Sequence, residues 1–165
     1  MRSRAAILAG RVMRSRAAIL GLGALALLFA CEKHEFEPPS REAQVAQADS
    51  LYTPALFDTI AWASDSARTF EGNNVFASYC RKCHGPTGEG GATAYAESRG
   101  LQVPSLVRSD WAAGSDVEAV RRRIFDGHPA GMPTWGVAGI TPREIDAVAH
   151  YIVNDLRPEV LGTSK

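Results

Sequence analysis

The sequence predicts an all-α domain of three to four short helices, preceded by an export signal and a polar segment. After residue 67, apolar residues recur at helical spacing, and there is no convincing run of the alternating pattern of strands. Two stretches, "SDVE" and "TPRE", have the capping-box pattern that begins helices. The length of 165 residues suits one domain with appendages, and a hydrophobic content of 45% is ordinary for a globular protein.

The first thirty residues predict a secretory signal peptide. The octapeptide "MRSRAAIL" occupies 1–8 and recurs at 13–20, which we interpret as an upstream start codon or a local duplication, with Met13 as the alternative true start. Its arginines are followed by the uncharged run 17–30, the pattern of an export signal. A transmembrane helix needs ~20 apolar residues. This shorter run therefore favours a cleaved signal over the alternative of an uncleaved anchor.

The apolar run ends in "LLFAC", which resembles the lipobox of bacterial lipoproteins, where the cysteine is acylated and becomes the first residue after cleavage. Cys31 is also the odd one of three cysteines if the other two act together, and an odd thiol in an exported protein needs a partner or a modification. We therefore predict that Cys31 is lipidated and holds the protein on the outer, periplasmic face of the cytoplasmic membrane. The alternative is an incidental cysteine in a discarded signal.

Residues 31–66 are expected to form a lipidated tether and an apolar strap. The stretch 32–50 is polar and contains two adjacent prolines, which is typical of a tether. The next stretch is too apolar for a free linker, so its side chains must cover a surface, either of their own domain or of a partner subunit. These side chains are Leu51, Tyr52, Leu56, Phe57, Ile60 and Trp62.

The charge of the remaining chain gives no sign of nucleic-acid binding. Residues 67–165 carry eleven basic and eleven acidic side chains, so the expected domain is neutral. Proteins that bind nucleic acids usually present a basic surface. We therefore expect protein and membrane partners, and no nucleic acid.

Three to four helices are expected in the domain 67–165. The first covers about 67–82 and should place Gly72, Phe76, Tyr79 and Cys83 on one face. A short helix is expected near 92–98, and the next begins at "SDVE" with Ser115 and Glu118 as its capping box and ends at Gly127. The last begins at Thr141, with Pro142 in the first helical position. Its apolar stripe consists of Ile145, Val148, Ile152 and Leu156. Helices this few and short bury little surface unaided, so a cofactor could complete the core.

The motif "CRKCH" indicates what that cofactor is. Cys80, Cys83 and His84 lie at i, i+3 and i+4, so on the last turn of a helix all three project within an arc of about 100°. The pattern C-x-x-C-H is the attachment signature of haem c, in which two thiols add to the haem vinyl groups and the histidine binds the iron. A thioredoxin-like dithiol would need a βαβ setting, and a zinc site would need a second pair of ligands. The sequence therefore predicts one covalent haem c.

The sixth iron ligand is expected to be Met132. It is the only methionine after Cys31, and a thioether suits ferrous iron and raises the reduction potential. His128 is a competitor, but it directly follows the expected helix end, whereas Pro133 stiffens the loop that carries the methionine. His150 lies beside an apolar helical stripe and is interpreted as a surface histidine.

The span 67–156 resembles the class I c-type cytochromes of bacteria. The stretch "CRKCHGPTGEGG" matches their attachment helix and glycine loop, "VPSL" their proline segment, and "IFDGHPAGMPTW" their methionine loop. The resemblance implies a small cytochrome c fold, thioether bonds at Cys80 and Cys83, and axial ligation by His84 and Met132. It also implies that the carbonyl of Pro104 accepts the other ring N–H of His84, which would orient the imidazole.

The resemblance also implies contacts inside the domain. Gly72 and Phe76 should meet Tyr151 where the first and last helices cross. The haem pocket should have Leu106, Trp111, Ile124 and Trp135 as walls.

An iron atom with two protein ligands has no open position for a substrate, which leaves one-electron transfer as its chemistry. We therefore expect no enzyme but a membrane-anchored monohaem carrier, or the electron-exit subunit of a respiratory complex, similar to the cytochrome subunit of alternative complex III. The expected donor is a quinol-oxidising complex or a dehydrogenase, and the acceptor a terminal oxidase or another cytochrome. The alternatives are a gas sensor or peroxidase-like enzyme with a dissociable Met132, and a structural subunit.

Overall fold

The computed structural model describes residues 36–163, which form an all-α structure, as the sequence predicts. Residues from Pro39 onward form a compact unit. The expected signal peptide 1–30 and the expected lipidation site Cys31 lie outside the described residues. Among residues 36–163, no helix has the length and apolarity that a membrane crossing requires.

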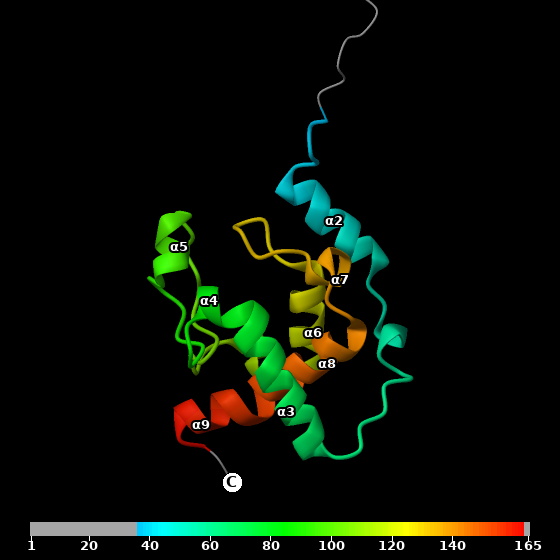
Figure 1. Cartoon of the computed structure of the whole chain (residues 1–165), viewed down its shortest axis with the longest axis vertical. Helices are drawn as coiled ribbons and strands as arrows, with labels where there is room; N and C mark the ends of the chain where they lie inside the picture. Colours follow the sequence, from blue (N-terminus) through cyan, green and yellow to red (C-terminus); the bar gives the residue numbers. More distant parts are fainter. Residues whose placement is uncertain (1–35, 164–165) are drawn as a thin grey trace, which may run out of the picture. The chain divides into compact units, whose positions relative to one another are not determined.

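Short helices joined by loops make up the compact unit (Figure 1). The α-helices are α2 (Arg41–Leu51), α3 (Asp65–Val75), α4 (Arg81–His84), α5 (Ala94–Ser98), α6 (Val117–Asp126), α7 (Trp135–Ala138), α8 (Pro142–Tyr151) and α9 (Arg157–Leu161). Two 3-10 turns cover Pro54–Leu56 and Ala112–Ser115, and two π turns cover Phe76–Cys80 and Ile152–Leu156. The only β pairing in this part of the chain is a bridge between His128 and Met132.

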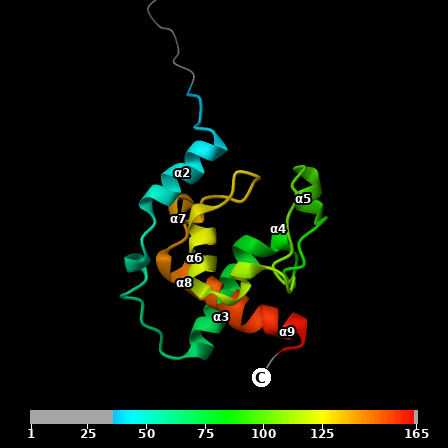
Figure 2. The same cartoon turned by 180° about the vertical axis from the view of Figure 1, so that it is seen from behind.

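The core lies where α3 crosses α8, as both views of the fold show (Figures 1 and 2). Gly72 allows the close approach, because a Cβ atom at this position would overlap the carbonyl oxygen of Ala147 and lie 2.6 Å from the Cβ of Tyr151. The rings of Phe76 and Tyr151 pack with their centroids 5.8 Å apart. The expectation that Gly72 and Phe76 meet Tyr151 is confirmed.

The first predicted helix is longer than expected and is interrupted by a π turn. It begins at Asp65, where Ser64 accepts a hydrogen bond from the Ala67 N–H, and it continues through the π turn Phe76–Cys80 to His84. The wider turn shifts the residues after it around the helix axis. Tyr79, expected on the same face as Gly72, is partly exposed and packs edge-on against Trp135 instead.

The predicted start of α8 is correct, whereas the predicted start of α6 is misplaced by one residue. At α8, Thr141 accepts from the Glu144 N–H, the Glu144 carboxylate accepts from the Thr141 N–H, and Pro142 takes the first position, as expected. At α6 the cap is Asp116, which accepts from the N–H groups of the two residues after Val117, and not Ser115. Aspartate is as good an N-cap as serine, so the two adjacent residues could not be distinguished by type.

The polar stretch expected to be a tether is partly helical. Helix α2 begins after Ser40, which caps it, and packs against α6 with Ala48 fully buried. The exposed ion pair between Asp49 and Arg122, 2.5 Å long, joins the two helices. The tether interpretation is therefore wrong for residues 41–50. It gave too much weight to polarity, whereas a helix needs only a narrow apolar stripe to pack on a domain.

The apolar strap that follows packs on its own domain. Phe57 is buried, and Tyr52, Leu56 and Ile60 pack against the core. The sequence left open whether the strap covers its own domain or a partner subunit, and this part of it covers its own domain.

A buried carboxylate fixes the end of the strap. Asp146 on α8 is 2% exposed and accepts hydrogen bonds from Trp62 Nε1 at 2.7 Å, from Arg68 at 2.5 Å and from Arg121. Burial acts to raise the pKa of Asp146, but hydrogen bonds from Arg68 and Trp62 and the charge of Arg121 outweigh it and lower the pKa. The ionised form of Asp146 thus connects the strap, α3, α6 and α8.

Replacing Asp146 by asparagine should lower the free energy of unfolding by about 3 kcal/mol, because it leaves Arg68 and Arg121 without their shared counter-charge. Because the folded-state pKa of Asp146 is lowered, its stabilising contribution is present above the ordinary carboxyl pKa and is lost as the pH falls through the folded-state value. Urea unfolding of wild type and variant at pH 7 and in acid would measure both effects. The matched control is Asp110→Asn, whose exposed pair with Arg108 should contribute little. Equal losses in both variants would contradict the role given to Asp146.

Candidate haem-binding site

A cavity of about 760 Å³ lies beside the attachment motif, within the range of about 300–1,000 Å³ that is usual for cofactor sites. It is lined by residues from the end of the attachment helix, from the chain after α5, from α6 and from the loop before α7. The five residues that the sequence singled out for cofactor binding all line it. They are Cys80, Cys83, His84, Pro104 and Met132.

Both cysteines of the motif are free thiols at the cavity wall. Burial, and to a lesser extent the charge of Cys83, raises the pKa of the Cys80 thiol to about 12, and burial also raises the pKa of Cys83. Reactive dithiols and metal-binding cysteines need a low pKa, because the thiolate is the active form. The two side chains therefore suit a covalent, uncharged thioether better than a redox dithiol.

His84 ends α4 and is held as a neutral imidazole. Burial lowers its pKa, an effect that the backbone of Pro104 partly opposes. The buried Nδ1 atom has no hydrogen-bond partner of ordinary geometry among the described residues, so its position relative to the Pro104 carbonyl falls short of a full bond. A neutral ring is the form that binds a metal. The hydrogen bond to Pro104 stays a prediction.

The glycine loop after the motif places Pro104 next to His84. The Gly90 N–H donates to the His84 carbonyl and the Gly91 N–H to the Val103 carbonyl, each at 2.8 Å. Gly90 has a positive φ of 70°, and a Cβ atom there would lie 2.7 Å from the Pro104 carbonyl oxygen. The loop therefore holds the proline segment against the attachment helix only because it contains glycine.

The loop that carries Met132 is a tight turn. The His128 N–H donates to the Met132 carbonyl at 3.0 Å, and the Gly131 N–H donates to the His128 carbonyl at 3.0 Å. Met132 is partly buried and packs against the core. This turn brings its side chain to the cavity wall.

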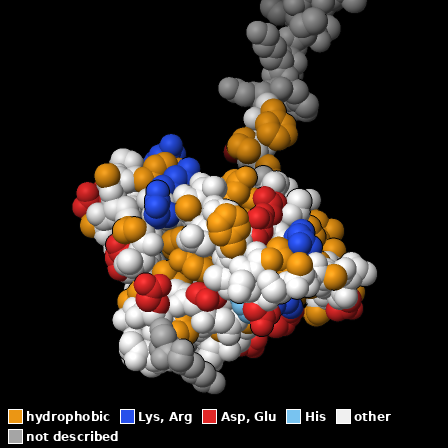
Figure 3. All heavy atoms as spheres, turned by 60° about the horizontal axis from the view of Figure 1, so that its bottom comes forward, with side chains coloured by type: hydrophobic (Ala, Val, Ile, Leu, Met, Phe, Trp, Pro, Cys, Tyr) orange, Lys and Arg blue, Asp and Glu red, His pale blue; other side chains and the backbone are white. Residues whose placement is uncertain are grey.

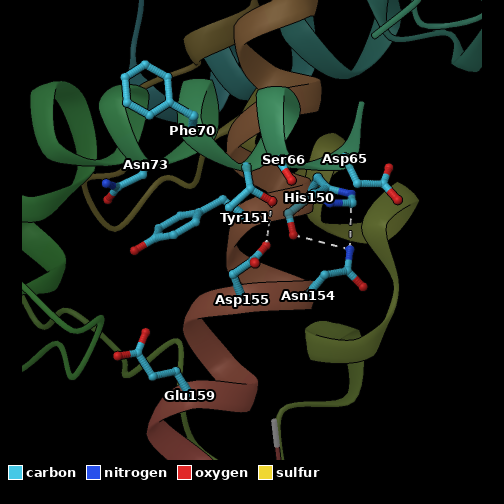
Figure 4. A pocket seen from close by; sticks show the side chains of 10 residues that line it. Asp65, Ser66, Phe70, Asn73, His150, Tyr151, Asn154, Asp155 and Glu159 are labelled. Carbon is cyan, nitrogen blue, oxygen red and sulfur yellow. Dashed lines mark hydrogen bonds between the residues drawn. The ribbon is translucent and has the colours of Figure 1, made fainter. Parts of the chain in front are cut away.

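The two competing histidines are less well placed. His128 lines the cavity, but its Nδ1 accepts a hydrogen bond from the Ala130 N–H at 3.1 Å. This hydrogen bond engages the lone pair of Nδ1 and favours the tautomer with the proton on Nε2, in which neither nitrogen is free to bind iron. His150 lies in a second pocket at the α3–α8 crossing, next to Asn154, and does not line the first cavity (Figure 4).

The walls of the cavity agree with the expectation except at one position. Leu106, Trp111 and Trp135 line it, whereas Ile124 is buried in the core and does not. Ile124 belongs to the buried core cluster together with Ile145 and Val148 of α8, and helical spacing alone did not show whether its face meets the core or the cavity.

The fold gathers a set of cationic side chains around the cavity. They are Arg41, Lys82, Arg99, Arg108 and Arg123, and among residues 36–163 no acidic side chain lines the cavity with them. They come from positions 41–123 of the chain, so only the fold brings them together. The face around the α3–α8 pocket differs, because Asp65, Asp155 and Glu159 line that pocket, and Figure 3 shows acidic side chains spread over the surface seen from below.

A comparison with protein families matches residues 67–152, just over half of the chain, to the family described as cytochrome C oxidase, cbb3-type, subunit III. The chain belongs to this family. Its cbb3-type subunit III domain is a cytochrome c domain, which implies one covalently bound haem c. The residues of the cavity fit that group, because they supply two uncharged thiols, a neutral imidazole and a thioether around a space of suitable size.

Curated relatives of this subunit III domain are named cbb3-type cytochrome c oxidase subunit CcoP. The protein of Rubrivivax gelatinosus is 26% identical over 74% of this chain and 36% of its own length. The protein of Cereibacter sphaeroides is 33% identical over 53% of this chain and 28% of its own length. The protein of Rhodobacter capsulatus is 31% identical over 63% of this chain and 37% of its own length. The chain thus spans about a third of the length of these relatives. No solved structure matches significantly.

Proposed function

We propose that this protein is a membrane-anchored monohaem cytochrome c that transfers single electrons in a respiratory chain. The observation that carries the proposal is one cavity that brings together Cys80, Cys83, His84 and Met132. In the proposed site the two cysteines hold the haem covalently, and His84 and Met132 bind the iron. When bound, haem c supplies a one-electron couple between Fe(III) and Fe(II).

The residues of the site have separate roles in this proposal. His84 is oriented by the Pro104 segment, which the Gly90 and Gly91 hydrogen bonds hold in place. The bridge between His128 and Met132 presents the thioether, and Trp111 and Trp135 supply apolar walls of the cavity. With His84 and Met132 both holding the iron, no position would be left for a substrate, which favours electron transfer over the sensor and peroxidase-like alternatives.

The wild-type protein, produced with haem, tests this function directly. The haem should remain on the polypeptide after denaturation and acid-acetone extraction, because thioether bonds survive unfolding. The reduced native protein should not bind CO, because the iron has no open position. Extraction of the haem would overturn the covalent site, and rapid, complete CO binding would favour a gas sensor or peroxidase-like enzyme.

We further propose that the partners are respiratory complexes on the periplasmic side of the membrane. The relatives are named as subunits of cbb3-type oxidases, which supports an oxidase as the acceptor or host complex, with a quinol-oxidising complex or a dehydrogenase as donor. The cytochrome subunit of alternative complex III is the other host that the sequence suggests. The cationic cavity lining favours a partner surface that is acidic around its own redox centre. Co-purification from native membranes in mild detergent would identify the host.

The proposed membrane anchor is a lipid on Cys31. Replacing Cys31 by serine should move the haem protein from the membrane fraction to the soluble fraction. Each buried methylene of an acyl chain contributes ~0.8 kcal/mol to binding, and the residues just after Cys31 are too polar to replace it. Membrane fractions washed with salt and mild alkali, compared with those of a Ser40→Ala control, would measure the change. Retention of the Cys31→Ser variant on membranes would assign anchoring to the uncleaved apolar run 17–30 or to the host complex.

A further inference from the structure

A buried arginine lies behind one wall of the cavity. Arg157 is the first residue of α9 and is only 7% exposed. Its Nη1 donates to the carbonyl oxygens of Leu106 and Arg108, the second at 3.2 Å. Its guanidinium lies 5.2 Å from the centre of the Trp111 ring, and Gly114 leaves the space that it fills, because a Cβ there would lie 2.7 Å from Nε.

The charge of Arg157 is uncompensated. Buried arginines are normally paired with a carboxylate, as Arg68 and Arg121 are with Asp146. Among residues 36–163, no carboxylate forms an ion pair with Arg157, and its hydrogen bonds go to backbone carbonyls. Burial lowers its pKa, but a guanidinium stays protonated at any physiological pH. A full positive charge therefore remains inside the domain.

This charge is next to the haem site without being part of it. Leu106, Arg108 and Trp111, the three residues that Arg157 contacts, all line the cavity, whereas Arg157 itself does not. It therefore lies one layer of side chains behind the wall. Solvent ions screen a buried charge weakly. A positive charge near iron disfavours Fe(III) more than Fe(II), because the oxidised haem carries one more positive charge.

We propose that Arg157 is a positioning residue that raises the reduction potential of the haem with its buried charge while it holds the 106–111 wall in place. Residue 157 lies in the C-terminal helix α9, beyond the matched family segment 67–152. The inference rests on the proposed placement of haem c in the cavity.

Two substitutions separate the charge from the packing. Arg157→Gln removes the charge, and Arg157→Lys keeps it; both lose part of the hydrogen bonding and should lower the urea midpoint of unfolding. Only Arg157→Gln should lower the reduction potential. At a fixed solution potential its Fe(III)/Fe(II) ratio should rise three- to tenfold, and a tenfold rise corresponds to 59 mV for one electron. If Arg157→Gln does not accumulate with haem, Arg157→Leu, which keeps apolar contact with Trp111, takes its place.

The matched control is Arg143→Gln. Arg143 also stacks on a tryptophan, Trp62, with 3.7 Å between guanidinium and ring centre, but neither residue lines the cavity. Its potential should equal that of the wild type. An unchanged potential in the neutral Arg157 variant, or equal decreases in the lysine and neutral variants, would overturn the role of the charge. These outcomes are read in haem-loaded protein, so they differ from failure of the proposed function, in which the wild type would lose its haem or bind CO.

Discussion

Replacing Met132 by alanine should open the haem iron to CO and cyanide and lower its reduction potential. The thioether is the only methionine sulfur in the described chain, and its side chain is held at the cavity by the turn between His128 and Met132. Without it the sixth position falls to water or to a stray nitrogen, and both favour Fe(III) relative to a thioether. The covalent haem should remain, because Cys80 and Cys83 are unchanged.

Absorption spectra and a redox titration measure this result. The near-infrared band between thioether and ferric iron should be present in the wild type and absent in Met132→Ala. The matched variant is His128→Gln, because His128 lines the same cavity four residues earlier. It should keep both the band and the closed iron. If His128→Gln, and not Met132→Ala, opens the iron, His128 is the ligand.

Replacing Gly72 by alanine should destabilise the fold and interfere with haem loading. The new methyl group would overlap the carbonyl oxygen of Ala147 and approach the Cβ of Tyr151 to 2.6 Å. Neither atom lies at the flexible end of a side chain, so α3 and α8 must separate. Overpacking of this kind costs about 3 kcal/mol, which exceeds the gain in helix propensity of about 1 kcal/mol from replacing glycine.

Chemical unfolding and haem loading measure the effect of Gly72→Ala. Asn74→Ala is the control, because Asn74 lies on the same helix and is exposed. It should leave stability nearly unchanged and load haem normally. A Gly72→Ala protein as stable as the wild type would show that the crossing of α3 and α8 is looser than the contacts indicate.

Local chemistry in the sequence predicted much of the fold and of the candidate site. The capping box at Thr141 was correct because the side chains that begin α8 are adjacent in sequence. The motif Cys80 to His84 indicated haem because its spacing fits one turn of a helix. Met132 was predicted as an iron ligand because it is the only methionine after Cys31, which the sequence shows directly. The family match supports the haem and the fold, whereas the individual ligands remain to be tested.

Features that depend on long-range contacts could not be predicted in this way. Helix α2 was mistaken for a tether because its packing on α6 depends on one small residue, Ala48, in a polar stretch. The π turn at Phe76–Cys80 has no obvious local signal, so the position of Tyr79 was wrong. Arg157 was not singled out, because its partners lie about fifty residues earlier in the chain.

The two π turns both set the direction in which the side chains after them point. Each is equivalent to one extra residue in a helix, and one residue corresponds to a rotation of about 100°. Both π turns follow the crossing of α3 and α8 within a few residues. The residues before each turn therefore keep their packing at the crossing, while the residues after it are rotated about the helix axis. The extra residue in the turn Phe76–Cys80 orients the "CRKCH" motif toward the cavity, and the extra residue in the turn Ile152–Leu156 orients Arg157 toward the cavity wall. Deleting a single residue from either turn would leave the crossing intact and point a functional group in another direction.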